Sequence, residues 1–194
     1  MSRKNYSGHK DQIEKAETNK AKEIVGLIVY CAVVVCLMFF IIKYVGQRTV
    51  VIGDSMESTL QDGDNLITDK LTYRFSDPKR FDVVVFPFKD NTNQLLIKRI
   101  IGLPNETIQI IDGKIYIDNR ELIEDYGNAQ MESAGLASDP IHLGPNEYFV
   151  LGDNRNNSQD SRFASVGNIH RSDLIGRAWV RIWPLNGISL LKHQ

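Results

Sequence analysis

Residues 24–42 read IVGLIVYCAVVVCLMFFII, a run of 19 residues without a charged side chain. As a helix this run would be roughly 28 Å long, about the thickness of the hydrocarbon core of a bilayer. A core helix of a globular domain would carry one polar face, whereas Gly26 and Tyr30 are the only breaks in this apolar run. The run therefore predicts a membrane-spanning helix.

A cleaved signal peptide is the alternative for this run. The apolar region of such a peptide usually has about 7–15 residues and is followed by small residues at the cleavage site. Here the run is longer, and the sequence KYVGQR at residues 43–48 offers no such site. We therefore expect a permanent signal anchor at 24–42, preceded by a flexible polar N-terminus at 1–23. A short linker at 43–48 and an outer domain at 49–194 follow it.

The charge of the chain differs on the two sides of the anchor. Residues 1–48 carry eight Lys or Arg against four Asp or Glu, a net charge of +4, and residues 49–194 have a net charge of −5. Most of the basic residues precede the anchor: Arg3, Lys4, Lys10, Lys15, Lys20 and Lys22. The positive-inside rule then predicts a single-pass protein of the plasma membrane with a cytoplasmic N-terminus and an extracytoplasmic domain. The net charge of −1 for the whole chain argues against a nucleic-acid partner.

The cysteines and histidines suggest neither a disulfide nor a metal. Cys31 and Cys36 are the only cysteines, and both lie in the anchor, so the outer domain has no thiol to pair. The four histidines do not combine with these cysteines into a zinc-binding spacing. We therefore expect neither a disulfide nor a zinc site in the outer domain.

The outer domain reads as a mainly β domain. Short runs rich in Val, Ile, Phe and Tyr predict strands at 49–52, 65–70, 82–87, 94–102, 107–111, 114–117, 147–151 and 174–183. Asp112-Gly113 between two of these runs is a strong hairpin signal. Residues 124–146 are rich in Gly and Pro and are expected to form a loop. The short strand spacing favours an antiparallel sheet or barrel-like domain behind the N-terminal transmembrane helix.

Three polar clusters follow strands of this domain. They are GDSMESTL at 53–60, IKRIIGLPNE at 97–106 and LGDNRNNSQDSR at 151–162. Taken singly, each has an ordinary interpretation: a turn, a strand with a solvated lysine, and a surface loop closed by ion pairs.

Together, in this order and behind an anchor, the clusters resemble the type I signal peptidases, which are membrane-anchored Ser/Lys proteases. The resemblance covers residues 24–185. It implies a mainly antiparallel β fold and a serine endopeptidase that removes signal peptides from exported preproteins without a metal or organic cofactor. Ser55 matches the nucleophile of the family and Lys98 its general base. The other matched positions are Ser158, which orients the lysine amine, the supporting ion pair of Asp160 and Arg162, and the loop opening at Gly152 and Asp153.

A lysine can act as the base only when its amine is neutral. An exposed lysine has a pKa near ~10.4, and desolvation lowers that value. Lowering it to about 8 costs on the order of 3 kcal/mol. We expect Leu96, Ile97 and Ile100 to desolvate Lys98, and the backbone N–H of Ser55 to bind the oxyanion.

The substrate implied by the resemblance is an extended peptide with small side chains near the cut. Such a chain can add to a sheet edge while alternate side chains enter pockets. The positions that match pocket walls are Val51, Met56, Leu60, Leu96 and Ile97, each of which also reads as ordinary core. Likewise, Phe86, Phe88, Trp179 and Trp183 suit either the membrane interface or the core.

The sequence departs from the family pattern at three places. Ser58 replaces a usual Pro, which we expect to loosen the turn; Gly53 replaces a serine that assists some members; and Asn105-Glu106 replaces Gly-Asp. Two other functions stay open: a LexA-type Ser/Lys self-cleaving protease, and a non-catalytic assembly partner for surface proteins.

Overall fold

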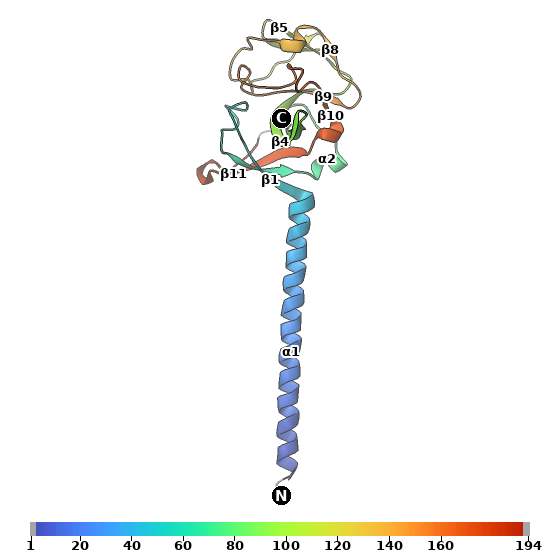
Figure 1. The fold of residues 1–194 in the computed structure, drawn as a ribbon, viewed down its shortest axis with the longest axis vertical. Coiled ribbons are helices and arrows are strands. Elements are labelled where there is room, and N and C mark those ends of the chain that lie inside the picture. Colours follow the sequence, from blue (N-terminus) through green and yellow to red (C-terminus); the bar gives the residue numbers. More distant parts are fainter. Residues whose placement is uncertain (1–2, 192–194) are drawn as a thin grey trace. The chain divides into compact units, whose positions relative to one another are not determined.

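The computed structural model describes residues 3–191, which divide into two compact units after Tyr44 (Figure 1). The outermost limits of the predicted segments, at residues 1 and 194, lie outside the described residues. Each unit is described by itself below.

The first unit is a single helix, α1 (Arg3–Phe40), followed by a π-helical turn at Ile41–Val45. Its segment Lys22–Phe40 is long and apolar enough to cross a membrane, with a mean hydropathy of 2.6. The side chains of this segment are largely exposed, as the lack of a polar face predicts for a helix that faces lipid. The expectation of a flexible segment before the anchor is wrong from Arg3 onward, because the same helix continues through it.

The second unit contains an antiparallel sheet of eight strands, which confirms the mainly β prediction. Each predicted strand overlaps an observed one, and β1 begins earlier than expected, within the predicted linker. In spatial order the strands are β1 (Gly46–Val50), β2 (Asn65–Asp69), β11 (Gly176–Trp183), β3 (Val83–Phe88), β4 (Asn91–Gly102), β9 (Glu147–Leu151) and β10 (Ile169–His170), with β12 (Ser189–Leu190) beside β11.

A smaller sheet of four strands lies between β4 and β9 in the sequence. Its order is β7 (Arg120–Glu121), β6 (Lys114–Ile117), β5 (Thr107–Ile111) and β8 (Ile141–His142). Asp112 and Gly113 adopt φ angles of 50° and 75°, as a tight hairpin turn requires. The predicted loop at 124–146 contains β8 and a 3₁₀ turn at Gly135–Ser138. The other helical segments are also single turns: α2 (Thr72–Phe75), Arg171–Asp173 and Leu185–Gly187.

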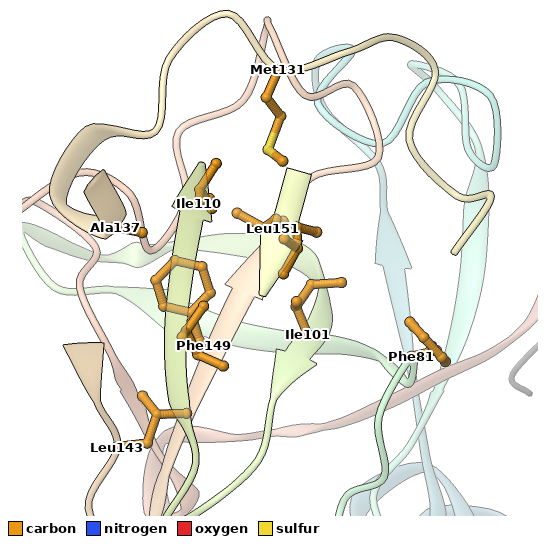
Figure 2. Packing of buried hydrophobic residues seen from close by; sticks show 10 residues of the cluster. Phe81, Ile101, Ile110, Met131, Ala137, Leu143, Phe149 and Leu151 are labelled. Carbon is orange, nitrogen blue, oxygen red and sulfur yellow. The ribbon is translucent and has the colours of Figure 1, made fainter. Parts of the chain in front are cut away.

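A buried cluster joins the two sheets. Figure 2 shows Ile101 of β4 and Phe149 and Leu151 of β9 packed with Ile110 of β5. Each fully buried side chain of this kind stabilises the fold by roughly 1.5–3 kcal/mol. The cluster fixes the ends of β4 and β9, and the second and third polar clusters of the sequence lie on or directly after these strands.

Candidate active site

Ser55 lies on a turn that is anchored in the core. The residue after it, Met56, is 1% exposed, and Leu60 at the end of the turn has no exposed surface. Backbone hydrogen bonds close the turn, from Glu57 N to Asp54 O at 3.0 Å and from Leu60 N to Met56 O at 2.8 Å. Buried anchors on one side of a short turn leave the Ser55 side chain on a rigid support, which suits a nucleophile.

Lys98 lies in the middle of β4, paired with buried Val84 of β3, and is only 2% exposed. Its Nζ lies 2.7 Å from Ser55 Oγ and donates to the carbonyl of Ile97 at 3.1 Å. Burial lowers the pKa of Lys98 from 10.5 to about 8, although the carboxylates of Asp160 and Asp153 act in the opposite direction. A large fraction of Lys98 is therefore neutral at mildly alkaline pH.

Arg99 binds the carboxylate of Asp153 through two hydrogen bonds. The distances are 2.8 Å from Nε to Oδ1 and 2.7 Å from Nη2 to Oδ2, and both side chains are buried. Thr59 Oγ1 donates to the same carboxylate at 2.6 Å, and Arg99 Nη1 donates to Phe81 O at 2.9 Å. The guanidinium also lies 3.7 Å from the centre of the Tyr126 ring. This network ties the Ser55 turn, β4 and the 152–162 loop together.

Arg162 and Asp160 form a second buried ion pair. Nε lies 2.8 Å from Oδ1 and Nη2 lies 2.9 Å from Oδ2. Asp160 also accepts a hydrogen bond from Gly152 N at 3.1 Å, so the pair closes the loop on itself. Arginines therefore hold both buried carboxylates near Lys98. In the described part of the chain, no group of three or more His, Cys, Asp or Glu side chains is arranged to hold a metal ion.

Gly152 and Ser158 pack against the turn at residues 54–60, called the nucleophile turn because it carries the candidate nucleophile Ser55. Asn154 N donates to Ser55 O at 3.1 Å, and a Cβ on Gly152 would overlap both Ser55 O and Ser158 Oγ. Only glycine fits this close approach of the loop to the turn. Ser158 Oγ is buried and has no hydrogen-bond partner among the described residues. The expected bond from Ser158 to the Lys98 amine is therefore absent from this structure.

A groove of about 410 Å³ opens beside Ser55 and Lys98. Four of the five predicted pocket residues line it, namely Val51, Met56, Leu96 and Ile97. The fifth, Leu60, is wholly buried in the core cluster beneath the turn and does not line the groove. Leu60 is therefore a core residue, which anchors the end of the nucleophile turn in the buried cluster.

The aromatic residues considered for the membrane interface separate into two groups. Phe86 is 1% exposed and Phe88 packs against the same core cluster, so the interface interpretation is wrong for Phe86. Trp179 and Trp183 are about half exposed on β11.

The backbone has a positive φ at each of the three departures from the family pattern. Ser58 has a φ of 84°, which proline cannot adopt. This turn therefore has a different backbone from a turn with proline at this position, and the expected loosening by loss of a proline does not apply. Asn105 has a φ of 67°, and the following Glu106 pairs with Arg80 and accepts from Leu103 N at 2.7 Å. Gly53 has a φ of 85°, which glycine adopts without strain.

Arg99, Thr59 and Tyr126 were not predicted as site residues from the sequence. The signal for Arg99 was present, since a strand that alternates sides places adjacent Lys98 and Arg99 on opposite faces. Two adjacent cations in an apolar strand require a buried partner for at least one of them.

A serine hydroxyl bonded to a buried lysine amine is the arrangement on which Ser/Lys hydrolases rely. The sequence profile of the family described as signal peptidase, peptidase S26, matches residues 24–183, and the chain belongs to this family. It is 39% identical over 162 residues to the "Probable signal peptidase I-2" of Synechocystis, covering 81% of this chain and 72% of that one. It is 31% identical to a signal peptidase I of Bacillus amyloliquefaciens, covering 92% and 98% of the two chains. A crystal structure of a signal peptidase I from Enterococcus faecalis matches with a TM-score of 0.45 and 32% identity, covering 53% of this chain and 97% of that chain.

Proposed function

We propose that the chain removes N-terminal signal peptides from exported preproteins, with Ser55 as nucleophile and Lys98 as general base. The observation that carries this proposal is the 2.7 Å hydrogen bond between Ser55 Oγ and the Nζ of a lysine that is 2% exposed. Family membership supports the reaction class, since the chain matches signal peptidases over most of its length.

The reaction proceeds in two steps at this pair. Neutral Lys98 takes the proton of Ser55 as Oγ attacks the scissile carbonyl, and the resulting ammonium then donates that proton to the leaving amine. The C–N bond breaks and the acyl group stays on Ser55. In the second step the same lysine takes a proton from a water molecule whose oxygen attacks the acyl carbon, the ester C–O bond to Ser55 breaks, and the lysine returns the proton to Ser55 Oγ. The backbone N–H of Ser55 is the proposed donor to the oxyanion.

The signal peptide occupies the groove beside the pair as an extended strand. The groove is lined by β1 with the residues after it and by the first half of β4. β1 pairs only with β2, and β4 pairs with β9 only from Arg99 onward. Two strand edges in the described chain are therefore free to bond a peptide backbone, while Val51, Leu96 and Ile97 contact its side chains.

We further propose that the outer domain lies at the outer face of the plasma membrane, with the N-terminus in the cytoplasm. The charge asymmetry supports this orientation. Exposed apolar side chains around the end of β11 and β12 support contact with the interface: Trp179, Trp183, Leu185, Ile188 and Leu190. In the full chain, Trp183→Ala should weaken the binding of the outer domain to lipid vesicles. Unchanged binding would count against contact of this surface with the membrane interface.

Cleavage of a preprotein tests the proposed function. The full chain in detergent is incubated with a preprotein, beside Ser55→Ala, Lys98→Ala and the control Lys114→Ala in the exposed Lys114–Glu121 pair. Wild type and the control should cleave it, and both site variants should not. An intact wild type that leaves the preprotein whole would favour the non-catalytic assembly partner. Cleavage of the chain itself alone would favour the self-cleaving protease.

A further inference from the structure

The groove beside the dyad also contains a charged side chain that takes no part in the reaction. The same cavity of about 410 Å³ is lined by Ser55, by Lys98 and by Arg48 of β1. Arg48 lies seven positions before Ser55 in the sequence. On β4, Asn93 and Gln94 line the groove five and four positions before Lys98. Arg48 and the reacting pair therefore belong to one groove, at different places along it.

The charge of Arg48 is not neutralised within the chain. Its Nε donates to the side-chain carbonyl of Asn65 at 2.8 Å, and its Nη2 donates to the same oxygen. Asn65 is uncharged, and no ion pair to Arg48 occurs among the residues that the structure describes. A guanidinium has five N–H donors, so the Nη1 group can still bond a ligand. Arg48 is exposed, which leaves this group accessible.

The groove lining carries the opposite charge to the domain around it. Residues 49–194 have a net charge of −5, whereas no Asp or Glu lines the groove. Lys98 is the only other residue of the lining with a basic side chain, and it is buried beside Ser55. Away from the dyad, the one full charge that a bound peptide meets in the groove is therefore the positive charge of Arg48.

The length of β4 indicates which part of a substrate meets Arg48. A strand rises about 3.3 Å per residue, so the step from Lys98 back to Gln94 and Asn93 is about 13–17 Å. An extended peptide that pairs with this edge covers the same distance with the same number of residues. The polar part of the groove then faces the residues four to six positions before the scissile bond.

A carboxylate is the side chain that this part of the groove suits. Arginine binds carboxylates through charge-assisted hydrogen bonds, and the amides of Asn93 and Gln94 add uncharged N–H donors nearby. A lysine or arginine of the substrate would meet a like charge here. The groove therefore distinguishes substrates by charge at a place well away from the residues at the cut.

We propose that Arg48 is a specificity-determining residue, which favours signal peptides with an acidic side chain about five residues before the scissile bond and disfavours a basic one there. This inference rests on the proposed function, because it takes the acyl half of the substrate to lie in the groove. Arg48 then acts on the choice of substrate and not on the chemical step.

Peptides that differ in one side chain test the proposal. Each carries Glu, Gln or Lys at the fourth, fifth or sixth position before the cut, and the rest of the sequence is constant. The readout is the ratio of kcat/KM for the Glu peptide to kcat/KM for the Gln peptide, and likewise for Lys, on the full chain in an uncharged detergent. Arg48→Gln and Arg48→Glu are compared with Arg120→Gln, which removes an exposed arginine of β7 outside the groove.

Wild type and Arg120→Gln should favour Glu over Gln, and Gln over Lys, by about threefold at one of these positions, as for an exposed ion pair. The ratios should approach one in Arg48→Gln and reverse in Arg48→Glu, and high salt should reduce them in wild type. Wild-type ratios near one at all three positions, or unchanged ratios in both Arg48 variants, would overturn the proposal while leaving the proposed function intact. If wild type cleaves neither the peptides nor a preprotein, the proposed function itself fails and this inference fails with it.

Discussion

Lys98 Nζ and Ser55 Oγ lie 2.7 Å apart, although 43 positions separate the two residues in the sequence. The buried Arg99–Asp153 pair and the Thr59 hydroxyl hold the elements that carry them together. The chain thus buries a lysine that is costly as a cation and holds the serine in place beside it. The following predictions test this arrangement.

Lys98→Met should stabilise the protein below pH 8. The pKa of Lys98 is lowered from 10.5 to about 8, so between these values the unfolded chain binds more protons than the folded one. Stability therefore rises with pH across this window, and below it the full cost is present, about 3 kcal/mol. Denaturant unfolding at pH 7 and pH 10 should show the advantage of the variant shrinking as pH rises. A pH-independent difference would argue against a buried, titrating amine.

Gly152→Ala should abolish activity and destabilise the fold. The added Cβ would overlap Ser55 O and Ser158 Oγ. The loop must therefore move away from the nucleophile turn. Overpacking of this kind costs about 1–3 kcal/mol. Thermal unfolding and preprotein cleavage measure the two effects. Gly26→Ala, where nothing lies within 4 Å of the new Cβ, is the matched control and should change neither.

Ser58→Pro should destabilise the nucleophile turn, although proline is usual at this position in the family. The φ of Ser58 is 84°, whereas the proline ring fixes φ near about −65°. We expect a loss of roughly 3 kcal/mol or more together with a lower kcat. Ser58→Gly relieves the backbone and should be neutral or slightly stabilising. A Ser58→Pro variant more stable than wild type would contradict the positive φ of Ser58 on which this prediction rests.

Asp153→Asn should cost about 3–5 kcal/mol, because Arg99 would be left as a buried cation without its carboxylate. The control is Glu121→Gln, which breaks the exposed pair with Lys114 and should change stability little. Chemical denaturation of both variants makes the comparison. Equal small losses would mean that the buried pair does not hold the site together.

The strands that carry the site were predictable because they are apolar, rich in β-branched residues and bounded by turns. The two-residue strands β7, β8, β10 and β12 were not, since so short a segment has no period of its own and forms only beside a partner. The extension of the helix α1 back to Arg3 was not predicted, because the polar residues before the anchor show no apolar face.

The site was predictable where residues matched a family motif, and less so where it depends on tertiary contacts. Ser55 and Lys98 lie together as the resemblance implies. The exclusion of Leu60 from the groove depends on which way the turn packs, and the Arg99–Asp153 pair depends on strand pairing between distant segments. The backbone of Ser58 was misjudged, because a family residue was assumed to share the family turn.

The pH dependence of kcat/KM in wild type tests the central claim most directly, since it reports the protonation of the free enzyme. If Lys98 is the base, kcat/KM for a peptide substrate should rise with pH and reach half its maximum near the Lys98 pKa of about 8. A rate that stays flat between about pH 6 and 9 would contradict the account, because a group with this pKa changes its protonation across that interval.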